Sequence, residues 1–189
     1  MTSCVREALF SMVYPSGVLR ESARALDLFA GSGVIGLEAL SRGVGHATFV
    51  DFSPTCVETI RQNSASLNVD DQVCVVQAKV EEMLAAPHLF GASGPFELVT
   101  VTPPYEEVIY SELVDALASS ALLAEDCLVI IEYPVELGIF PPVLAEGRLV
   151  GLRNRRYGRT VLAMYVAQPS GRLGLLPFTE EFVSLSKRR

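Results

Sequence analysis

Apolar residues recur along the chain at two different periods, and segments of the two kinds alternate. Over residues 3–14, Val5, Leu9, Met12 and Val13 fall on one face of a helix. Short apolar runs typical of strands follow at 25–29, 47–51, 73–77, 96–101 and 127–133. Helices are expected between these runs, at 34–42, 54–67, 80–86 and 108–122. Two last apolar runs, 149–155 and 160–166, predict a hairpin.

This order of elements predicts the fold class. Strands that alternate with helices favour an α/β fold with a doubly wound, mostly parallel sheet and helices on both faces. We expect seven strands, with the closing hairpin antiparallel. Residues 1–167 are predicted to form one domain that includes the N-terminal helix, and 168–189 a loosely attached C-terminal extension.

Composition excludes several classes of protein. Half of the residues are apolar and 20% are charged, which is unlike a disordered chain. No apolar run approaches the ~20 residues of a membrane helix, and no apolar leader opens the sequence. The four cysteines show no C-x-x-C spacing and the two histidines are isolated, so neither a metal site nor a disulfide framework is expected. We predict an intracellular, reduced protein without a membrane partner.

Charge is unevenly distributed along the chain. The 15 basic residues are outnumbered by 22 acidic ones, for a net charge of −7, which argues against a surface that binds phosphates everywhere. No Lys or Arg occurs between Lys79 and Arg148. Five arginines then follow without an acid among them: Arg148, Arg153, Arg155, Arg156 and Arg159. This pattern fits either a solvated hairpin or an Arg-rich edge that contacts phosphates.

A glycine-rich turn follows the strand predicted at 25–29. Gly31, Gly33 and Gly36 match G-x-G-x-x-G, and Asp51 ends the next strand 20 residues after Gly31. Glycines let the backbone approach a ligand at a helix N-terminus, and such a carboxylate accepts hydrogen bonds from ribose hydroxyls. The pattern fits a nicotinamide cofactor, S-adenosylmethionine, or a tight turn that only needs glycine.

Asp27 precedes the glycines and separates these possibilities. Its carboxylate could pair with the amino group of a methionine-type ligand, whereas a dinucleotide offers no cation there. The alternative interpretation is that Asp27 caps the backbone of the turn.

The second candidate motif is Thr102-Pro103-Pro104-Tyr105, directly after the strand predicted at 96–101. Two prolines make a rigid turn at the carboxyl end of a strand, where ligands bind in such sheets. Tyr105 could stack on a flat base. The motif is also compatible with a plain turn that ends a strand.

Taken together, the motifs resemble the RsmD-type 16S rRNA guanine-N2 methyltransferases. The similar segments are Val-Arg-Glu-Ala-Leu-Phe at 5–10, Leu-Asp-Leu-Phe-Ala-Gly-Ser-Gly at 26–33, Gly-Leu-Glu-Ala-Leu-Ser-Arg-Gly at 36–43, Pro-Pro-Tyr at 103–105, Glu132, and Tyr-Gly-Arg-Thr at 157–160. The resemblance covers about residues 3–166. It implies a class I, Rossmann-like methyltransferase fold that uses S-adenosylmethionine to methylate the exocyclic amine of a guanine in small-subunit rRNA or an assembly intermediate.

The resemblance also implies residue roles. Asp27, Phe29, Gly31 and Gly33 would lie at the methionine end of the cofactor, and Asp51 with Phe52 at its ribose end. Thr102, Pro103, Pro104 and Tyr105 would form the catalytic motif, with Tyr105 stacked on a flipped-out guanine. Arg6, Arg153, Arg155 and Arg156 would lie near RNA. By analogy the protein would be a monomer, in the cytoplasm of a bacterium or in a plastid or mitochondrion.

Three departures from the family pattern leave alternatives open. Thr102 stands where the family has Asp, and Lys79 where it has an adenine-binding Asp. The sequence shows no counterpart of the basic hairpin that precedes the first helix in the family, so we expect either a fragment or a different substrate. A second hypothesis is therefore a catalytically impaired, methyltransferase-like module that binds RNA or assists ribosome assembly. A third is a nicotinamide-dependent oxidoreductase, which would leave Asp27 and Pro-Pro-Tyr unexplained.

Overall fold

The computed structural model describes residues 1–184, and within them the chain forms one sheet of eight strands. The strands are β1 (Arg24–Leu28), β2 (His46–Asp51), β3 (Val73–Gln77), β4 (Phe96–Val101), β5 (Leu123–Pro134), β6 (Val143–Leu144), β7 (Leu149–Tyr157) and β8 (Thr160–Ala167). The α-helices are α1 (Ser3–Val13), α2 (Val34–Ser41), α3 (Pro54–Leu67), α4 (Val80–Ala85) and α5 (Tyr110–Ser119). The predicted α/β class is confirmed.

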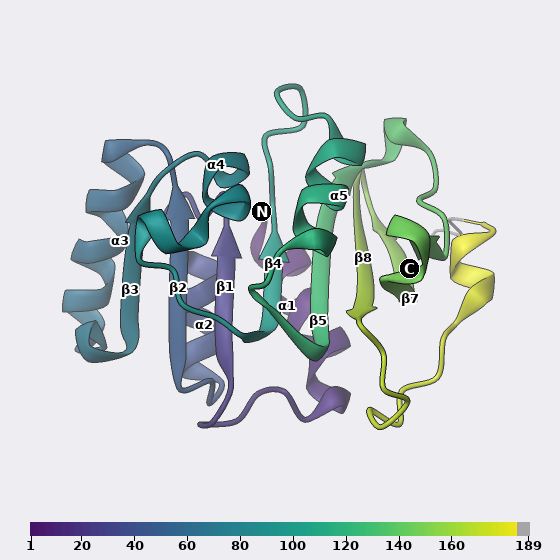
Figure 1. Ribbon diagram of the computed structural model, residues 1–189, viewed down its shortest axis with the longest axis horizontal. Helices are drawn as coiled ribbons and strands as arrows, with labels where there is room; N and C mark the ends of the chain where they lie inside the picture. The colour runs from purple at the N-terminus through teal and green to yellow at the C-terminus, as the bar shows by residue number, and fades with distance from the viewer. Residues whose placement is uncertain (185–189) are drawn as a thin grey trace.

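The order in which the chain adds strands to the sheet reverses between β1 and β4. Its order is β3-β2-β1-β4-β5-β8-β7-β6, in which β3 to β5 run parallel and β8, β7 and β6 are antiparallel additions (Figure 1). From β1 the chain first builds outward through β2 and β3, and then returns to add β4 on the other side. The carboxyl ends of β1 and β4 therefore form a crevice, which is the usual ligand position in such folds.

Helices cover both faces of the sheet, as predicted. The apolar faces of α4 and α5 pack with Leu26, Leu28 and Val129 on one side. On the other side α1, α2 and Ile60 of α3 pack with Phe49 and Leu128. Figure 1 shows α4 and α5 in front of the sheet and α1 and α2 behind it. The central strands are buried on both faces, which explains their continuous apolar runs.

The clearest differences from the prediction concern the number of strands and the segment around β5. Seven strands were expected, and the eighth is β6, which is only two residues long and pairs with β7. A segment this short has no period that a sequence pattern can reveal. The helix expected over 108–122 covers only Tyr110–Ser119, and the strand expected over 127–133 already begins at Leu123 and ends at Pro134.

The described part of the C-terminal extension, residues 168–184, is mostly exposed and contacts the hairpin at a few points. Phe182 is 5% exposed, and its ring packs edge-on against Tyr165 with the centroids 5.7 Å apart. The Phe178 N–H donates a hydrogen bond to the Leu152 carbonyl over 3.0 Å. A single buried aromatic ring carries no periodic signal, so the sequence pattern did not indicate this contact. Residues 185–189 of the predicted extension lie outside the described part.

No helix within residues 1–184 is long and apolar enough to cross a membrane.

Candidate active site

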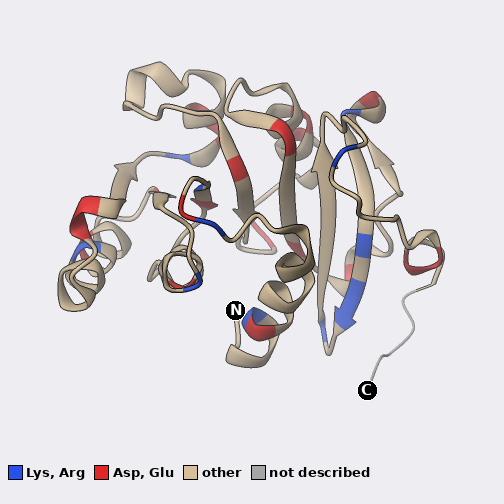
Figure 2. Cartoon of the chain, turned by 90° about the horizontal axis from the view of Figure 1, so that it is seen from below, with Lys and Arg blue, Asp and Glu red and all other residues tan. Residues whose placement is uncertain are grey.

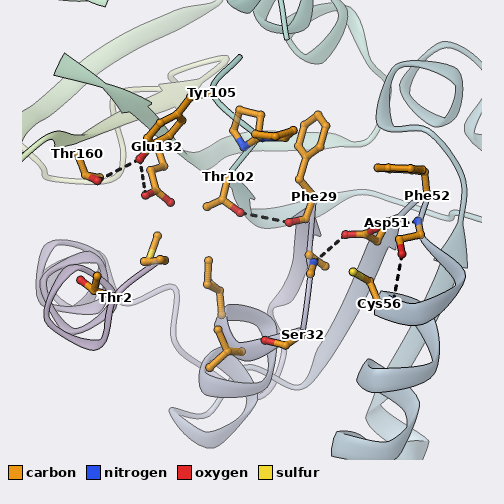
Figure 3. Close-up of a pocket in the computed structure, with 18 residues that line it drawn as sticks. Thr2, Phe29, Ser32, Asp51, Phe52, Cys56, Thr102, Tyr105, Glu132 and Thr160 are labelled. Carbon is orange, nitrogen blue, oxygen red and sulfur yellow. Dashed lines mark hydrogen bonds between the residues drawn. The ribbon is translucent and has the colours of Figure 1, made fainter. Parts of the chain in front are cut away.

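A pocket of about 860 Å³ lies at the carboxyl ends of the central strands. That volume is in the range of small-molecule sites. Its wall combines the loops after β1, β2 and β4 with the ends of β5 and β8 (Figure 3). Among the predicted site residues, the lining includes Phe29, Gly31, Asp51, Phe52, Thr102, Pro103, Pro104 and Tyr105. The two motifs recognised in the sequence, 70 residues apart, thus meet in one cavity.

The glycine-rich turn leads from β1 into α2 along the pocket. Gly31 and Gly33 have φ values of 56° and 76°, in the left-handed region that glycine adopts without strain. Phe29 also has a positive φ, 59°, although its side chain disfavours this conformation. Strained residues of this kind cluster at ligand sites. A Cβ atom on Gly31 would have no neighbour within 4 Å, so its backbone is accessible from the cavity.

Asp51 ties the turn to the end of β2. Its Oδ2 accepts a hydrogen bond from the Gly31 N–H over 2.8 Å, and its Oδ1 accepts one from the Ser53 N–H over 2.9 Å. The next residue, Phe52, also lines the pocket and is 60% exposed. A carboxylate beside an exposed aromatic ring suits a nucleoside, whose ribose has hydroxyl donors and whose base is flat.

Asp27 is not part of the pocket wall. Its side chain is buried, its Oδ1 accepts a hydrogen bond from the Thr100 hydroxyl over 2.7 Å, and its Oδ2 accepts one from the Gly36 N–H over 3.0 Å. Burial raises the pKa of Asp27 to about 7. The geometry therefore supports the capping interpretation, and the contact with a ligand amino group that the resemblance implies stays a prediction. Gly33 likewise lies beneath the wall, packed near Ile60 and Phe49.

The Thr102-Pro-Pro-Tyr turn forms the opposite wall. The Thr102 hydroxyl donates a long hydrogen bond of 3.4 Å to the Phe29 carbonyl, which links the loops after β4 and β1. Pro103 is buried, while Pro104 and Tyr105 are exposed at the pocket rim.

Tyr105 is held by two residues that the sequence analysis did not place in the site. Its hydroxyl donates a hydrogen bond to Oε1 of Glu132 over 2.8 Å and lies 3.0 Å from the Thr160 hydroxyl (Figure 3). Burial raises the pKa of Tyr105 to about 12; the hydrogen bond with Thr160 opposes this shift and the Glu132 carboxylate adds to it, so the hydroxyl stays protonated. Glu132 is an acid near the end of an otherwise apolar run in β5, and that anomaly was the available signal in the sequence.

The arginines expected near RNA lie outside the pocket lining. Arg6 forms an ion pair with Glu38, while Arg153 and Arg155 approach the Glu181 carboxylate within 3.7 Å and 3.1 Å. Arg156 donates to the Gly158 carbonyl over 2.7 Å. Figure 2 shows basic residues along one strand of the C-terminal hairpin. Their predicted role stays a prediction.

Lys79 does not intrude on the cavity either. It is absent from the lining, and its ammonium lies 3.8 Å from Glu82 at the start of α4. Within residues 1–184, no group of three or more His, Cys, Asp or Glu side chains is arranged to hold a metal ion.

Comparison with known proteins identifies the family. The family model described as "Conserved hypothetical protein 95" matches residues 1–166. The chain belongs to this family. It is the family of the RsmD-type proteins, so the resemblance seen in the sequence is confirmed at family level.

Relatives and solved structures of the RsmD-type family agree with this assignment. "Ribosomal RNA small subunit methyltransferase D" of Escherichia coli (strain K12) is 32% identical over 170 residues, which are 90% of this chain and 80% of that protein. The structure of the Escherichia coli protein yhhF is 31% identical, with a TM-score of 0.77 over 89% of this chain and 87% of its own. An RNA methyltransferase from Salinibacter ruber, solved in complex with S-adenosyl-L-homocysteine, shares the fold. Its TM-score is 0.64 at 16% identity, over 90% of this chain and 94% of that one.

Proposed function

We propose that this protein is an S-adenosylmethionine-dependent methyltransferase that modifies the exocyclic N2 amine of a guanine in small-subunit rRNA. One observation carries the proposal: the glycine-rich turn with Asp51 and the Pro-Pro-Tyr turn line the same pocket of about 860 Å³. The first half suits a nucleoside cofactor and the second a flat base. The name of the Escherichia coli relative supports the substrate class.

The pocket fits S-adenosylmethionine. The backbone around Gly31 is open to the cavity, Phe52 presents an exposed ring, and the Asp51 carboxylate stands between them. Asp51 would accept hydrogen bonds from the ribose hydroxyls, Phe52 would pack on the adenine, and Gly31 would allow close approach to the methionine part. When bound, the cofactor supplies the electrophilic methyl group.

The other wall would hold the target base. Pro103 and Pro104 make the turn rigid, so that Tyr105 is presented in one orientation and a flipped-out base can stack on its ring. Catalysis of this kind depends on positioning two reactants in line. No cysteine of this chain belongs to either motif, so no covalent enzyme intermediate is required.

The two alternatives from the sequence are less well supported. A nicotinamide-dependent enzyme leaves the Pro-Pro-Tyr wall and its tether to Glu132 unexplained. An impaired binding module was suggested by Thr102 and Lys79. Lys79 lies outside the pocket lining, which leaves Thr102 as the remaining argument. The monomeric state and the compartment stay predictions.

The test has a binding part and a transfer part. Calorimetry should detect micromolar binding of S-adenosylhomocysteine and none of a reduced nicotinamide. Asp51→Ala should weaken that binding at least tenfold, because it removes a charged hydrogen-bond acceptor and frees the Gly31 turn. Glu58→Ala, on the exposed face of α3, is the matched control.

Methyl transfer is then measured on unmodified small-subunit rRNA and on assembly particles, with the modified nucleotide identified by mass spectrometry. We expect N2-methylguanosine at one position. Binding of S-adenosylhomocysteine without transfer to any of these substrates would overturn the proposal in favour of the non-catalytic module.

A further inference from the structure

We propose that Glu132 is a catalytic residue: its carboxylate accepts a hydrogen bond from the target amine and then takes up the proton which that amine loses. This inference rests on the proposed function and deepens it. It assigns to a residue near the end of β5 a task for which Thr102, a neutral residue already bonded to the Phe29 carbonyl, offers no charge.

The pocket lining contains two carboxylates, and they differ in what they already bind. Both oxygens of Asp51 accept backbone N–H groups, from Gly31 and Ser53. Glu132 accepts the Tyr105 hydroxyl on Oε1, whereas Oε2 has no hydrogen-bond donor among residues 1–184. The side chain is 6% exposed and its carboxylate points into the cavity (Figure 3). A largely buried carboxylate oxygen without a donor is complementary to an N–H group of a ligand.

The position of Glu132 suits the amine of a stacked base. Its carboxylate sits at the rim of the Tyr105 ring, 2.8 Å from the hydroxyl, so a base lying on that ring presents its edge to Oε2. Thr102, in the turn directly after the adjacent strand β4, is neutral, and its hydroxyl already donates to the Phe29 carbonyl. Among the described residues that line the pocket, Glu132 is therefore the one that offers a carboxylate on this side of the cavity.

The step balances with Glu132 as proton acceptor. The lone pair of the amine nitrogen forms the new N–C bond, and the electrons of the broken C–S bond stay on sulfur, which becomes a neutral thioether. The nitrogen then releases one proton to Oε2, which passes it to solvent. A hydrogen bond from the amine to a carboxylate before transfer also orients the lone pair. Loss of the carboxylate is therefore expected to lower kcat.

Glu132→Gln is the decisive variant. The amide oxygen still accepts the Tyr105 hydroxyl and the side-chain volume is unchanged, but charge and basicity are lost. We expect kcat for rRNA methylation to fall about 100-fold, with KM, rRNA affinity in filter binding and S-adenosylhomocysteine affinity each within about twofold of the unaltered protein.

Two further substitutions distinguish a contact between Glu132 and the target amine from its hydrogen bond with Tyr105. The double variant that adds Thr102→Asp to Glu132→Gln should have a kcat at least tenfold higher than Glu132→Gln alone. The reason is that the Phe29 carbonyl repels the new carboxylate toward the cavity. Tyr105→Phe removes the tether but leaves the Glu132 carboxylate, and should lower kcat less than Glu132→Gln does.

The outcomes are distinct. A Glu132→Gln protein that keeps a third or more of kcat overturns the inference. So does a Tyr105→Phe protein that loses as much as Glu132→Gln, since Glu132 would then act only by positioning the ring. So does a loss that Thr102→Asp leaves unrestored. An unaltered protein without transfer activity would instead refute the proposed function itself.

Discussion

Single buried polar groups set the geometry of the pocket from behind its wall. Asp27 illustrates this, because its carboxyl group joins the Gly36 amide at the start of α2 to the Thr100 hydroxyl on β4. Burial in this position favours the protonated form and raises the pKa of Asp27 to about 7. The residue thus connects three elements that line the crevice, and its protonation affects how firmly they are joined.

The raised pKa of Asp27 predicts a pH-dependent stability. Between about pH 4 and pH 7 the folded protein keeps this proton and the unfolded chain releases it, so the stabilisation is complete at the acidic end and is lost as pH rises to about 7. Each pKa unit corresponds to about 1.4 kcal/mol, so the loss amounts to a few kcal/mol.

Asp27→Asn isolates this contribution. The variant keeps the acceptor for Thr100 but places an amide donor against the Gly36 N–H, and it has no proton to lose. In urea unfolding the difference in stability between the two proteins should be largest near pH 4 and should shrink as pH rises toward 8. A difference that stays constant over this range would contradict the assignment of the pKa.

At the scale of elements, the approach of α2 to β2 depends on the absence of a side chain. A Cβ atom at Gly36 would lie 2.3 Å from Cε1 of Phe49, in the core beneath the glycine-rich turn. The third glycine of the motif thus serves helix–strand packing, while Gly31 serves the cavity. One sequence motif therefore combines two physical requirements that act on opposite sides of the same turn.

Gly36→Ala should destabilise the protein. Alanine gains about 1 kcal/mol over glycine in a helix, but overpacking a core typically costs 1–3 kcal/mol, and contact with a fully buried ring belongs at the upper end of that range. We expect a net loss of about 1–2 kcal/mol in the free energy of unfolding.

Phe49→Leu provides the control for this prediction, because it removes the ring that the new Cβ atom meets. The double variant should lose clearly less stability than the sum of the two single variants, since the two residues are in contact. Strict additivity would show that the effect of Gly36→Ala does not arise from this contact.

On the scale of the whole molecule, the C-terminal segment changes the electrostatics of the hairpin. Glu181 is 8% exposed, accepts the Asn154 N–H over 3.1 Å and pairs with Arg155 and Arg153. It lies against the part of β7 that does not pair with the short strand β6. Two of the four arginines that were predicted to meet RNA therefore face a carboxylate of their own chain.

If the hairpin contacts rRNA, Glu181→Gln should raise RNA affinity severalfold at low salt and less at high salt, because it leaves more positive charge for phosphates. The matched control is Glu180→Gln, which changes net charge equally at an exposed position. Filter binding at several salt concentrations measures both. An equal effect of the two variants would show that net charge, and not the hairpin, governs binding.

Much of this protein follows from its sequence because the relevant information is local. Hydrophobic period alone predicts the α/β class, and the bounds of β3, β4 and α3 match the predicted ranges. Glycines that need a positive φ, and prolines that stiffen a turn, act on their own segment of backbone. The two motifs that line the pocket were therefore recognisable without the fold.

Distances between separate elements, in contrast, depend on how the strands and helices pack together. Tyr105, Glu132 and Thr160 meet because β4, β5 and β8 are neighbours in the sheet, and strand order is not a property of any local pattern. The same holds for the two acids near the turn: Asp27 points into the core and Asp51 lines the cavity. Both acids are plausible ligands by residue type, and only the packing of α2 on the sheet determines which of them a ligand can reach.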